Sequence, residues 1–165
     1  MPGAGKSVLG LELSNLLGIP FYDLDEGIEH EAGMSIPEIF ESKGEKYFRT
    51  MESKLLRKIP EMTAHFVLST GGGAPCFFDN MGFMNEEGNS IFLEVPLDVI
   101  AGRLMENGLD DRPLLKGKSR EELINYLEEQ YEKRVSHYSK AEAVVSGDDL
   151  KAEELLTEIR KRGWV

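Results

Sequence analysis

Short apolar stretches alternate with longer helical patterns along the whole chain, and this alternation limits the folds open to it. The candidate strands cover residues 21–24, 65–69, 90–95 and 143–146. Helical patterns lie between and around them, at about 6–17, 35–59 (as two helices), 97–105, 119–135 and 150–162. Strands that alternate with helices form a mostly parallel sheet covered on both faces. Ligands of such sheets bind at the carboxyl ends of the strands, so residues there are the first candidates for a functional site.

Length and charge narrow the class of protein further. The 165 residues suit one domain, predicted here to span 1–165. A formal net charge of −11 argues against partners that need a basic surface, such as nucleic acid or an anionic membrane. The single Cys76 excludes a disulfide framework within the chain, and we interpret it as a packing residue. No apolar run is long enough for a membrane span, and no signal peptide is visible, so we expect a cytoplasmic protein.

The segment Gly3-Ala4-Gly5-Lys6-Ser7 matches the second half of the phosphate-binding P-loop pattern G-x-x-x-x-G-K-[ST]. Its glycines allow backbone N–H groups to surround phosphate oxygens at the positive end of the helix that follows. Lys6 can neutralise phosphate charge, and the Ser7 hydroxyl can bind Mg²⁺. The alternative is an accidental glycine-rich stretch, which the amphipathic helix directly after it disfavours.

Asp23 and Asp25 come at the end of the first candidate strand, where side chains two residues apart point to the same side. The two carboxylates can therefore meet beside the P-loop, one holding Mg²⁺ through water and the other orienting a reacting hydroxyl. The alternative interpretation is the solvated first turn of a helix, since acidic residues are common there. The residues alone favour neither.

Further along the chain, several short motifs follow in a fixed order. They are Phe48-Arg49-x-x-Glu52, Gly71-Gly72-Gly73-Ala74, Asp111-Arg112-Pro113-Leu114-Leu115 and Arg134-x-x-x-Tyr138. Together with the P-loop half and the D-x-D pair, they make the chain resemble the shikimate kinases from Met1 to its last helix. Each motif is weak alone, but six in order at compatible spacings are very improbable by chance. An apolar cluster, Phe77, Phe78, Met81, Phe83 and Met84, is interpreted separately as a helix packed on the sheet.

The resemblance implies a three-layer αβα P-loop kinase with a five-stranded parallel sheet in the order 2-3-1-4-5. It also implies a lid at about residues 107–118 and substrate-binding helices at about 25–60. The implied activity is the Mg²⁺-dependent transfer of the γ-phosphoryl group of ATP to the 3-hydroxyl of shikimate, in the synthesis of aromatic amino acids. A monomer is expected.

On the nucleotide side, the resemblance assigns the P-loop residues Gly3 to Ser7 to ATP. Lys6 would contact the transferred phosphoryl group as a catalytic residue, and Ser7 and Asp23 would hold the metal. Arg112, on the lid, would stabilise charge in the transition state. Arg103 resembles the arginine near the adenine.

On the substrate side, Asp25 would bind the shikimate hydroxyls and act as the catalytic base. Arg49 and Arg134 would hold the shikimate carboxylate, because two planar guanidinium groups fix both the position and the rotation of a small acid. Glu52, one helical turn after Arg49, would orient it. The backbone of Gly71, Gly72 and Gly73 would approach the substrate ring, which a Cβ would obstruct. The alternative for both arginines is an ordinary surface ion pair.

Two other functions stay open at this point. One is a kinase of another small hydroxy acid or sugar, such as gluconate. The other is a non-catalytic nucleotide-binding remnant, because the first P-loop glycine would stand before Met1. In the implied fold, a central apolar strand also precedes that glycine, and this sequence lacks it. We therefore expect a misassigned start codon or a truncated sequence.

Overall fold

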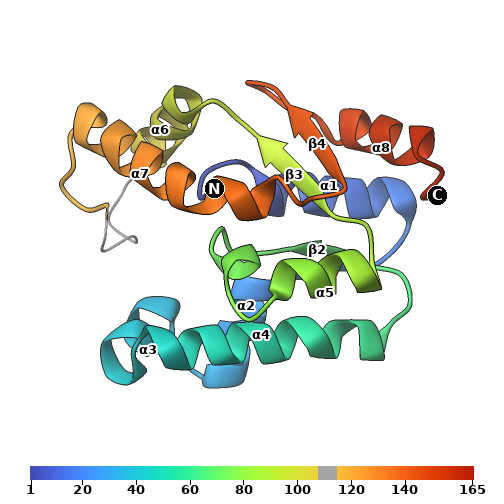
Figure 1. Ribbon diagram of the computed structural model, residues 1–165, viewed down its shortest axis with the longest axis horizontal. Coiled ribbons are helices and arrows are strands. Elements are labelled where there is room, and N and C mark those ends of the chain that lie inside the picture. The colour runs from blue at the N-terminus through green and yellow to red at the C-terminus, as the bar shows by residue number, and fades with distance from the viewer. Residues whose placement is uncertain (108–114) are drawn as a thin grey trace.

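A computed structural model describes residues 1–107 and 115–165 of the chain. The helices are α1 (Lys6–Leu17), α2 (Leu24–Ala32), α3 (Ile36–Lys43), α4 (Glu45–Met62), α5 (Asn80–Glu87), α6 (Leu97–Glu106), α7 (Arg120–Tyr138) and α8 (Ala152–Lys161), with a short 3₁₀ turn η1 (Ala74–Cys76). The strands are β1 (Phe21–Asp23), β2 (Val67–Ser69), β3 (Ile91–Glu94) and β4 (Ala143–Ser146). Helices surround the strands on both sides (Figure 1).

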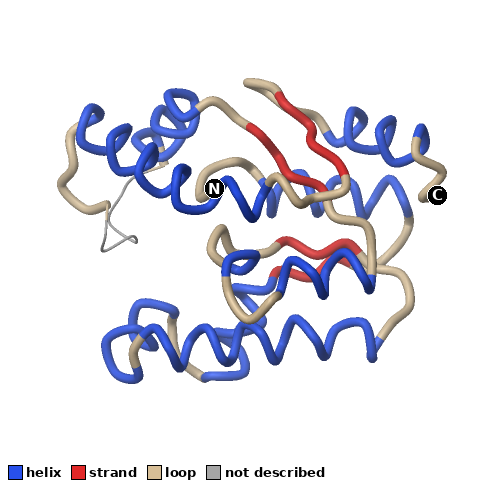
Figure 2. The backbone as a smooth tube through the Cα atoms, in the orientation of Figure 1, coloured by secondary structure: helices blue, strands red, loops and turns tan. Residues whose placement is uncertain are grey.

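The strands form two parallel pairs instead of one continuous sheet (Figure 2). β1 pairs with β2, with Phe21 opposite Val67, and β3 pairs with β4, with Ile91 opposite Ala143. This is the expected order 2-3-1-4-5 without its central strand, so the α/β fold class predicted from the sequence agrees with the pairing. Within the described residues, β2 and β3 each keep one edge without a strand partner.

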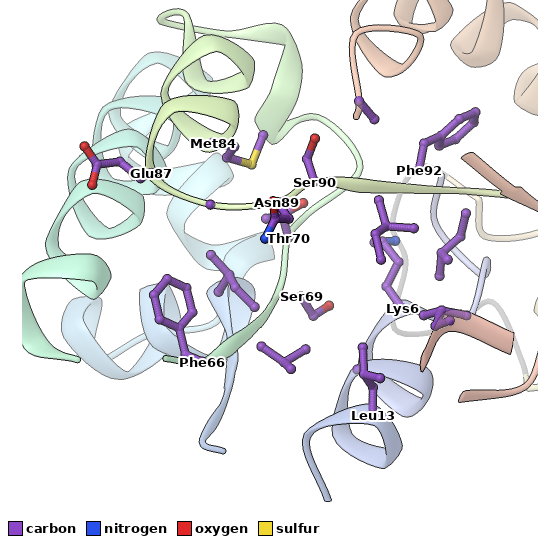
Figure 3. A pocket seen from close by; sticks show the side chains of 18 of the residues that line it. Lys6, Leu13, Phe66, Ser69, Thr70, Met84, Glu87, Asn89, Ser90 and Phe92 are labelled. Atoms are coloured by element: carbon purple, nitrogen blue, oxygen red, sulfur yellow. The ribbon is translucent and has the colours of Figure 1, made fainter. Parts of the chain in front are cut away.

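A cavity of about 450 Å³ separates these two edges. Its walls include Ser69 and Thr70 from β2 and its continuation, Phe92 from β3, and Leu13 from α1 (Figure 3). Met1 also lines it and is itself buried. Burial, with Lys6 and Arg134 nearby, lowers the pKa of the Met1 α-amino group to about 4. We call this cavity the inter-sheet slot.

Glycines delimit α1, whose bounds agree with the helix expected at about residues 6–17. Gly5, with φ of +87°, stands directly before the helix, and Gly18, with φ of +67°, ends it by donating its N–H to the carbonyl of Ser14. Both angles lie in the left-handed region that favours glycine. On the face of α1 toward the β1–β2 pair, a Cβ on Gly10 would lie 2.8 Å from the Phe21 ring. Glycine therefore allows the helix and β1 to pack closely.

Buried side chains form two separate clusters. The larger one lies among α1, β3 and helices α6 to α8, and includes Leu13, Leu93 and Leu127. The smaller one lies among helices α2 to α4, and includes Ile28 and Leu56. In the described part of the chain, no helix has both the length and the apolar character to cross a membrane.

Some expectations about local structure are wrong. The strand expected to end at Leu24 ends at Asp23, because the Asp23 side chain caps a helix that begins at the next residue. The apolar cluster expected on one helix is divided, since α5 begins only at Asn80, after Phe77 and Phe78. Both residues before the helix, Phe78 and Asp79, have positive φ, which ordinary helical periodicity cannot indicate.

Candidate active site

The P-loop segment turns tightly before α1. Gly3 has φ of +75° and Gly5 of +87°, values that a residue with a Cβ rarely adopts. A Cβ on Gly3 would also lie 3.0 Å from the Leu104 side chain of α6. Lys6, the first residue of α1, donates from Nζ to the Met1 carbonyl at 2.7 Å. The ammonium group is thus held over the loop, at the end of the helix where backbone N–H groups lack helical partners.

Ser7 and Asp23 meet directly beside this loop. The Ser7 hydroxyl donates to Oδ2 of Asp23 at 2.6 Å and lies 3.3 Å from the Ser69 hydroxyl. The other carboxylate oxygen of Asp23 accepts from the backbone N–H groups of Asp25 at 3.0 Å and Glu26 at 3.4 Å. One oxygen therefore fixes the carboxylate to α2, and the second faces the P-loop serine.

The glycine turn after β2 brings the predicted substrate residues together. A Cβ on Gly71 would lie 2.8 Å from Oδ1 of Asp25; one on Gly73 would lie 2.6 Å from Nη2 of Arg49. One on Gly72 would lie 3.4 Å from Nη1 of Arg134. Three consecutive glycines thus border three side chains from α2, α4 and α7. None of the three has positive φ, so glycine is required here for space and not for backbone conformation.

Two carboxylates bind the N–H groups along the edge of the Arg49 guanidinium. Its Nε donates to Glu45 at 3.3 Å, and its Nη1 donates to both oxygens of Glu52 at 3.1 and 2.9 Å. The Glu52 side chain is fully buried, while that of Arg49 keeps 11% exposure. This is a buried, hydrogen-bonded pair one helical turn apart, as the sequence predicts for Glu52, and not an exposed surface ion pair.

Burial and neighbouring charges shift the two carboxyl groups of the site in the same direction. Burial raises the pKa of Asp25, and the nearby Asp23 charge raises it further, although Lys6 and Arg49 oppose the shift. Burial also raises the pKa of Glu52, against the lowering effect of Arg49. A raised pKa makes a carboxylate a better proton acceptor, so Asp25 has the character that general base catalysis requires.

Arg134 and Tyr138 face the turn from α7, one helical turn apart. Arg134 donates from Nη2 to the Gln130 side chain at 2.9 Å, and Nη1 lies toward Gly72. The buried Tyr138 hydroxyl donates to the Gly72 carbonyl at 2.6 Å, and its ring stacks on Phe92 at 4.9 Å. A single hydrogen bond therefore fixes the distance between α7 and the glycine turn.

Arg103 lies at the other side of the P-loop. Its Nη1 is 3.7 Å from the Cβ position of Gly5, and its Nη2 donates to the Asp148 carbonyl at 2.6 Å. Arg112, and with it most of the predicted lid at 107–118, lies outside the described residues. Among residues 1–107 and 115–165, no group of three or more histidine, cysteine or acidic side chains could hold a metal ion. Burial raises the pKa of the Cys76 thiol, which favours its unreactive form.

The family comparison agrees with this geometry. The sequence profile described as shikimate kinase matches residues 2–162. The chain belongs to the shikimate kinase family. A shikimate kinase of Parabacteroides distasonis is 44% identical over 156 residues, which cover 94% of this chain and 86% of the relative. One of Aquifex aeolicus is 40% identical, with 94% of this chain and 88% of the relative covered.

Solved structures of shikimate kinases have the same fold. That of the enzyme from Bacteroides thetaiotaomicron superposes with a TM-score of 0.90 at 37% identity, over 99% of this chain and 94% of that one. The Acinetobacter baumannii enzyme, solved in complex with shikimate, gives a TM-score of 0.83 at 32% identity, over 97% and 87% of the two chains. The P-loop kinase fold inferred from the sequence is confirmed by these similarities.

Some residues beside the candidate site carry no family motif noted in the sequence. Phe77 contacts Arg49, 28 positions earlier in the chain, and no periodicity links the two. Arg57 binds the loop that holds Phe77, and it follows Arg49 by eight residues on the same helix. That spacing, two helical turns, is the one sequence signal that could have associated Arg57 with the site.

Proposed function

We propose that this chain transfers the γ-phosphoryl group of ATP to the 3-hydroxyl of shikimate, with Mg²⁺ as cofactor. The observation that carries the proposal is the glycine turn, where Asp25, Arg49 and Arg134 converge on three adjacent residues that have no side chains of their own. A carboxylate beside two guanidinium groups suits a small substrate with one acid group and several hydroxyls. The relative solved with shikimate bound supports the choice of acid.

The roles follow from the surroundings of each side chain. Arg49 and Arg134 bind the shikimate carboxylate from opposite helices, α4 and α7. Asp25 accepts the proton of the attacking hydroxyl, a role that its raised pKa supports. Lys6 neutralises charge on the transferred phosphoryl group, and the lid residue Arg112 completes this charge stabilisation. These assignments define the reacting centre as the space between the P-loop and the glycine turn.

Mg²⁺ fits the oxygen donors beside the P-loop. Ser7 and Asp23, with their side-chain oxygens 2.6 Å apart, would hold it. Mg²⁺ binds few protein ligands and keeps waters and phosphate oxygens, so a hydroxyl and a carboxylate suffice without a larger acidic cluster. When bound, the ion supplies positive charge to the phosphate oxygens. Arg103, between the P-loop and the loop after β4, is assigned to the adenine side.

The net charge of −11 does not oppose two anionic substrates. Lys6, Arg49, Arg103 and Arg134 come from distant parts of the sequence and gather around the P-loop and the glycine turn. Charges close to a ligand in a partly buried site outweigh acids on the distant surface. One chain supplies all these side chains, so a monomer would suffice for activity.

A coupled assay for ADP tests the proposal. Turnover with ATP, Mg²⁺ and shikimate is expected, and turnover should be far slower when gluconate replaces shikimate. Activity with gluconate but none with shikimate would favour the other kinase. ATP binding without turnover of either acid would favour a nucleotide-binding remnant.

The same assay tests the acceptor role of Asp25 through pH. Because the pKa of Asp25 is raised, kcat should fall on the acid side at a pH above the ordinary aspartate pKa of 3.8. Asp25→Asn should fold and lose nearly all turnover, and near-normal turnover would remove Asp25 from this role.

A further inference from the structure

Two aromatic rings contact the Arg49 guanidinium in addition to its two carboxylate partners. Its Cζ lies 4.9 Å from the centre of the Phe48 ring and 4.4 Å from that of the Phe77 ring. Phe48 precedes Arg49 on α4 and is buried, whereas Phe77 comes from the loop after η1. Both distances are within the range of cation–π attraction. The orientation of the guanidinium therefore depends on a residue outside its own helix.

The backbone that presents Phe77 is strained. Phe78 has φ of +49° and Asp79 of +54°, and neither residue is glycine. Such conformations persist only where surrounding contacts enforce them. Here Arg57 donates from Nη2 to the Phe78 carbonyl at 3.0 Å, and the buried Asn80 side chain donates to the Ala74 carbonyl at 2.9 Å. The loop is therefore tied down on both sides of the strained pair.

The ties lead back to the helix that carries Arg49. Arg57 donates from Nη1 to Oδ1 of Asn80 at 2.7 Å, and the Ser53 hydroxyl donates to the same oxygen at 2.9 Å. Arg49, Ser53 and Arg57 are spaced by four residues on α4, so they share one face. One face of α4 thus carries the cation and also anchors the loop whose aromatic ring contacts it.

We infer that Phe77 is a positioning residue for substrate binding. Its ring restricts the long Arg49 side chain to the orientation in which the guanidinium lies along Gly73, beside the proposed carboxylate site. Without the ring, Glu45 and Glu52 still pair with Arg49, but they hold only its Nε and Nη1 atoms. The inference rests on the proposed function, because it assigns Phe77 to the binding of the acid that Arg49 receives.

Steady-state kinetics of three single variants test the role. Phe77→Leu should raise the KM for shikimate about five- to tenfold, as expected for losing one partly desolvated cation–π contact, with kcat and the KM for ATP within about twofold of wild type. Phe77→Tyr keeps the ring and should restore the wild-type KM. Phe78→Leu is the matched control, because Phe78 is exposed and has no ring contact with Arg49, and its KM should not change.

A spectroscopic measurement reports on Arg49 directly and needs no substrate. Protons above the face of an aromatic ring resonate upfield, so the Arg49 Nε–H signal of ¹⁵N-labelled protein should move downfield in Phe77→Leu and stay in place in Phe77→Tyr and Phe78→Leu. An unchanged Arg49 signal, or an unchanged shikimate KM in Phe77→Leu, would overturn the inference and leave the proposed function intact. A folded wild-type protein that does not phosphorylate shikimate would overturn both.

Discussion

Replacing Arg49 by Met should destabilise the fold by an amount that increases with pH. The side chain of Met retains apolar contact with the neighbouring rings but removes both hydrogen bonds to Glu52, which is fully buried. Leaving a buried carboxylate without its partner typically costs about 3–5 kcal/mol. At neutral pH we therefore expect a loss of this size in the free energy of unfolding, or about 6–20 °C in Tm for a domain of this length.

The sign of the pH dependence follows from Glu52. Burial already raises its pKa above the ordinary value of 4.5, Asp25 adds to the shift, and Arg134 and Arg49 oppose it. Without Arg49, the folded-state pKa rises further, so the folded protein takes up a proton more readily than the unfolded chain. The loss on mutation is therefore smallest below the folded-state pKa of the wild-type protein, and it grows by up to about 1.4 kcal/mol per pH unit between that pKa and the higher folded-state pKa of the variant.

Urea unfolding from pH 5 to pH 8 measures this dependence. The matched control is the same Arg49→Met change in a Glu52→Gln background, which has no buried carboxylate to be left without a partner. There the loss in the free energy of unfolding should be small and constant with pH. Titration of Asp25 contributes to all four proteins, so the double-mutant cycle largely removes it. A loss that is equal at all pH values, or equal in both backgrounds, would refute the reasoning.

Three further substitutions give separate readouts. Ser7→Ala removes one of two proposed metal ligands and should raise the KM for Mg·ATP about tenfold in steady-state kinetics. The affinity for shikimate, measured by isothermal titration, should not change. Gly71→Ala places a methyl group 2.8 Å from the Asp25 carboxylate and should lower kcat about a hundredfold, whereas Gly102→Ala, whose Cβ would meet nothing within 4 Å, should leave kcat unchanged. Tyr138→Phe leaves the Gly72 carbonyl without its donor and should cost about 1–3 kcal/mol in urea unfolding.

Much of the fold could be predicted because its local signals are strong. The helix expected at about residues 6–17 agrees with α1, and Gly18, a residue type that favours a left-handed cap, follows its last residue. The helix after Ser119 begins as expected, with reciprocal hydrogen bonds between Ser119 and Glu122 at 2.7 and 3.3 Å. The expected end at about Val135 is three residues too early, because helix ends depend on packing that a sequence does not display.

Site residues that belong to a motif can be predicted from the sequence, whereas residues whose position depends on packing alone cannot. Asp25, Arg49 and Arg134 belong to recognisable motifs, and the structure places all three at the glycine turn. Phe77 belongs to none, because its position depends on a strained turn and on contacts with Arg57, far away in sequence. The acidic pair at the end of β1 does begin a helix, as one of the two interpretations weighed for it expects, since Asp23 caps α2 and Asp25 lies in its first turn. Its role toward a metal or a reacting hydroxyl stays a prediction.

Backbone amides of β2 lie in two different environments, because one edge of this strand faces β1 and the other faces the inter-sheet slot. Val67 donates its N–H to the Pro20 carbonyl on the β1 side at 2.9 Å. Because successive N–H groups of a strand point to opposite sides, the N–H of Leu68 points away from β1 and toward the slot. Hydrogen exchange should therefore be slow at Val67 and fast at Leu68. Both residues are half-buried, yet of their two amides only that of Val67 faces the partner strand. Within residues 1–107 and 115–165 the two strand pairs share no hydrogen-bond ladder, so cohesion between them depends on side-chain packing.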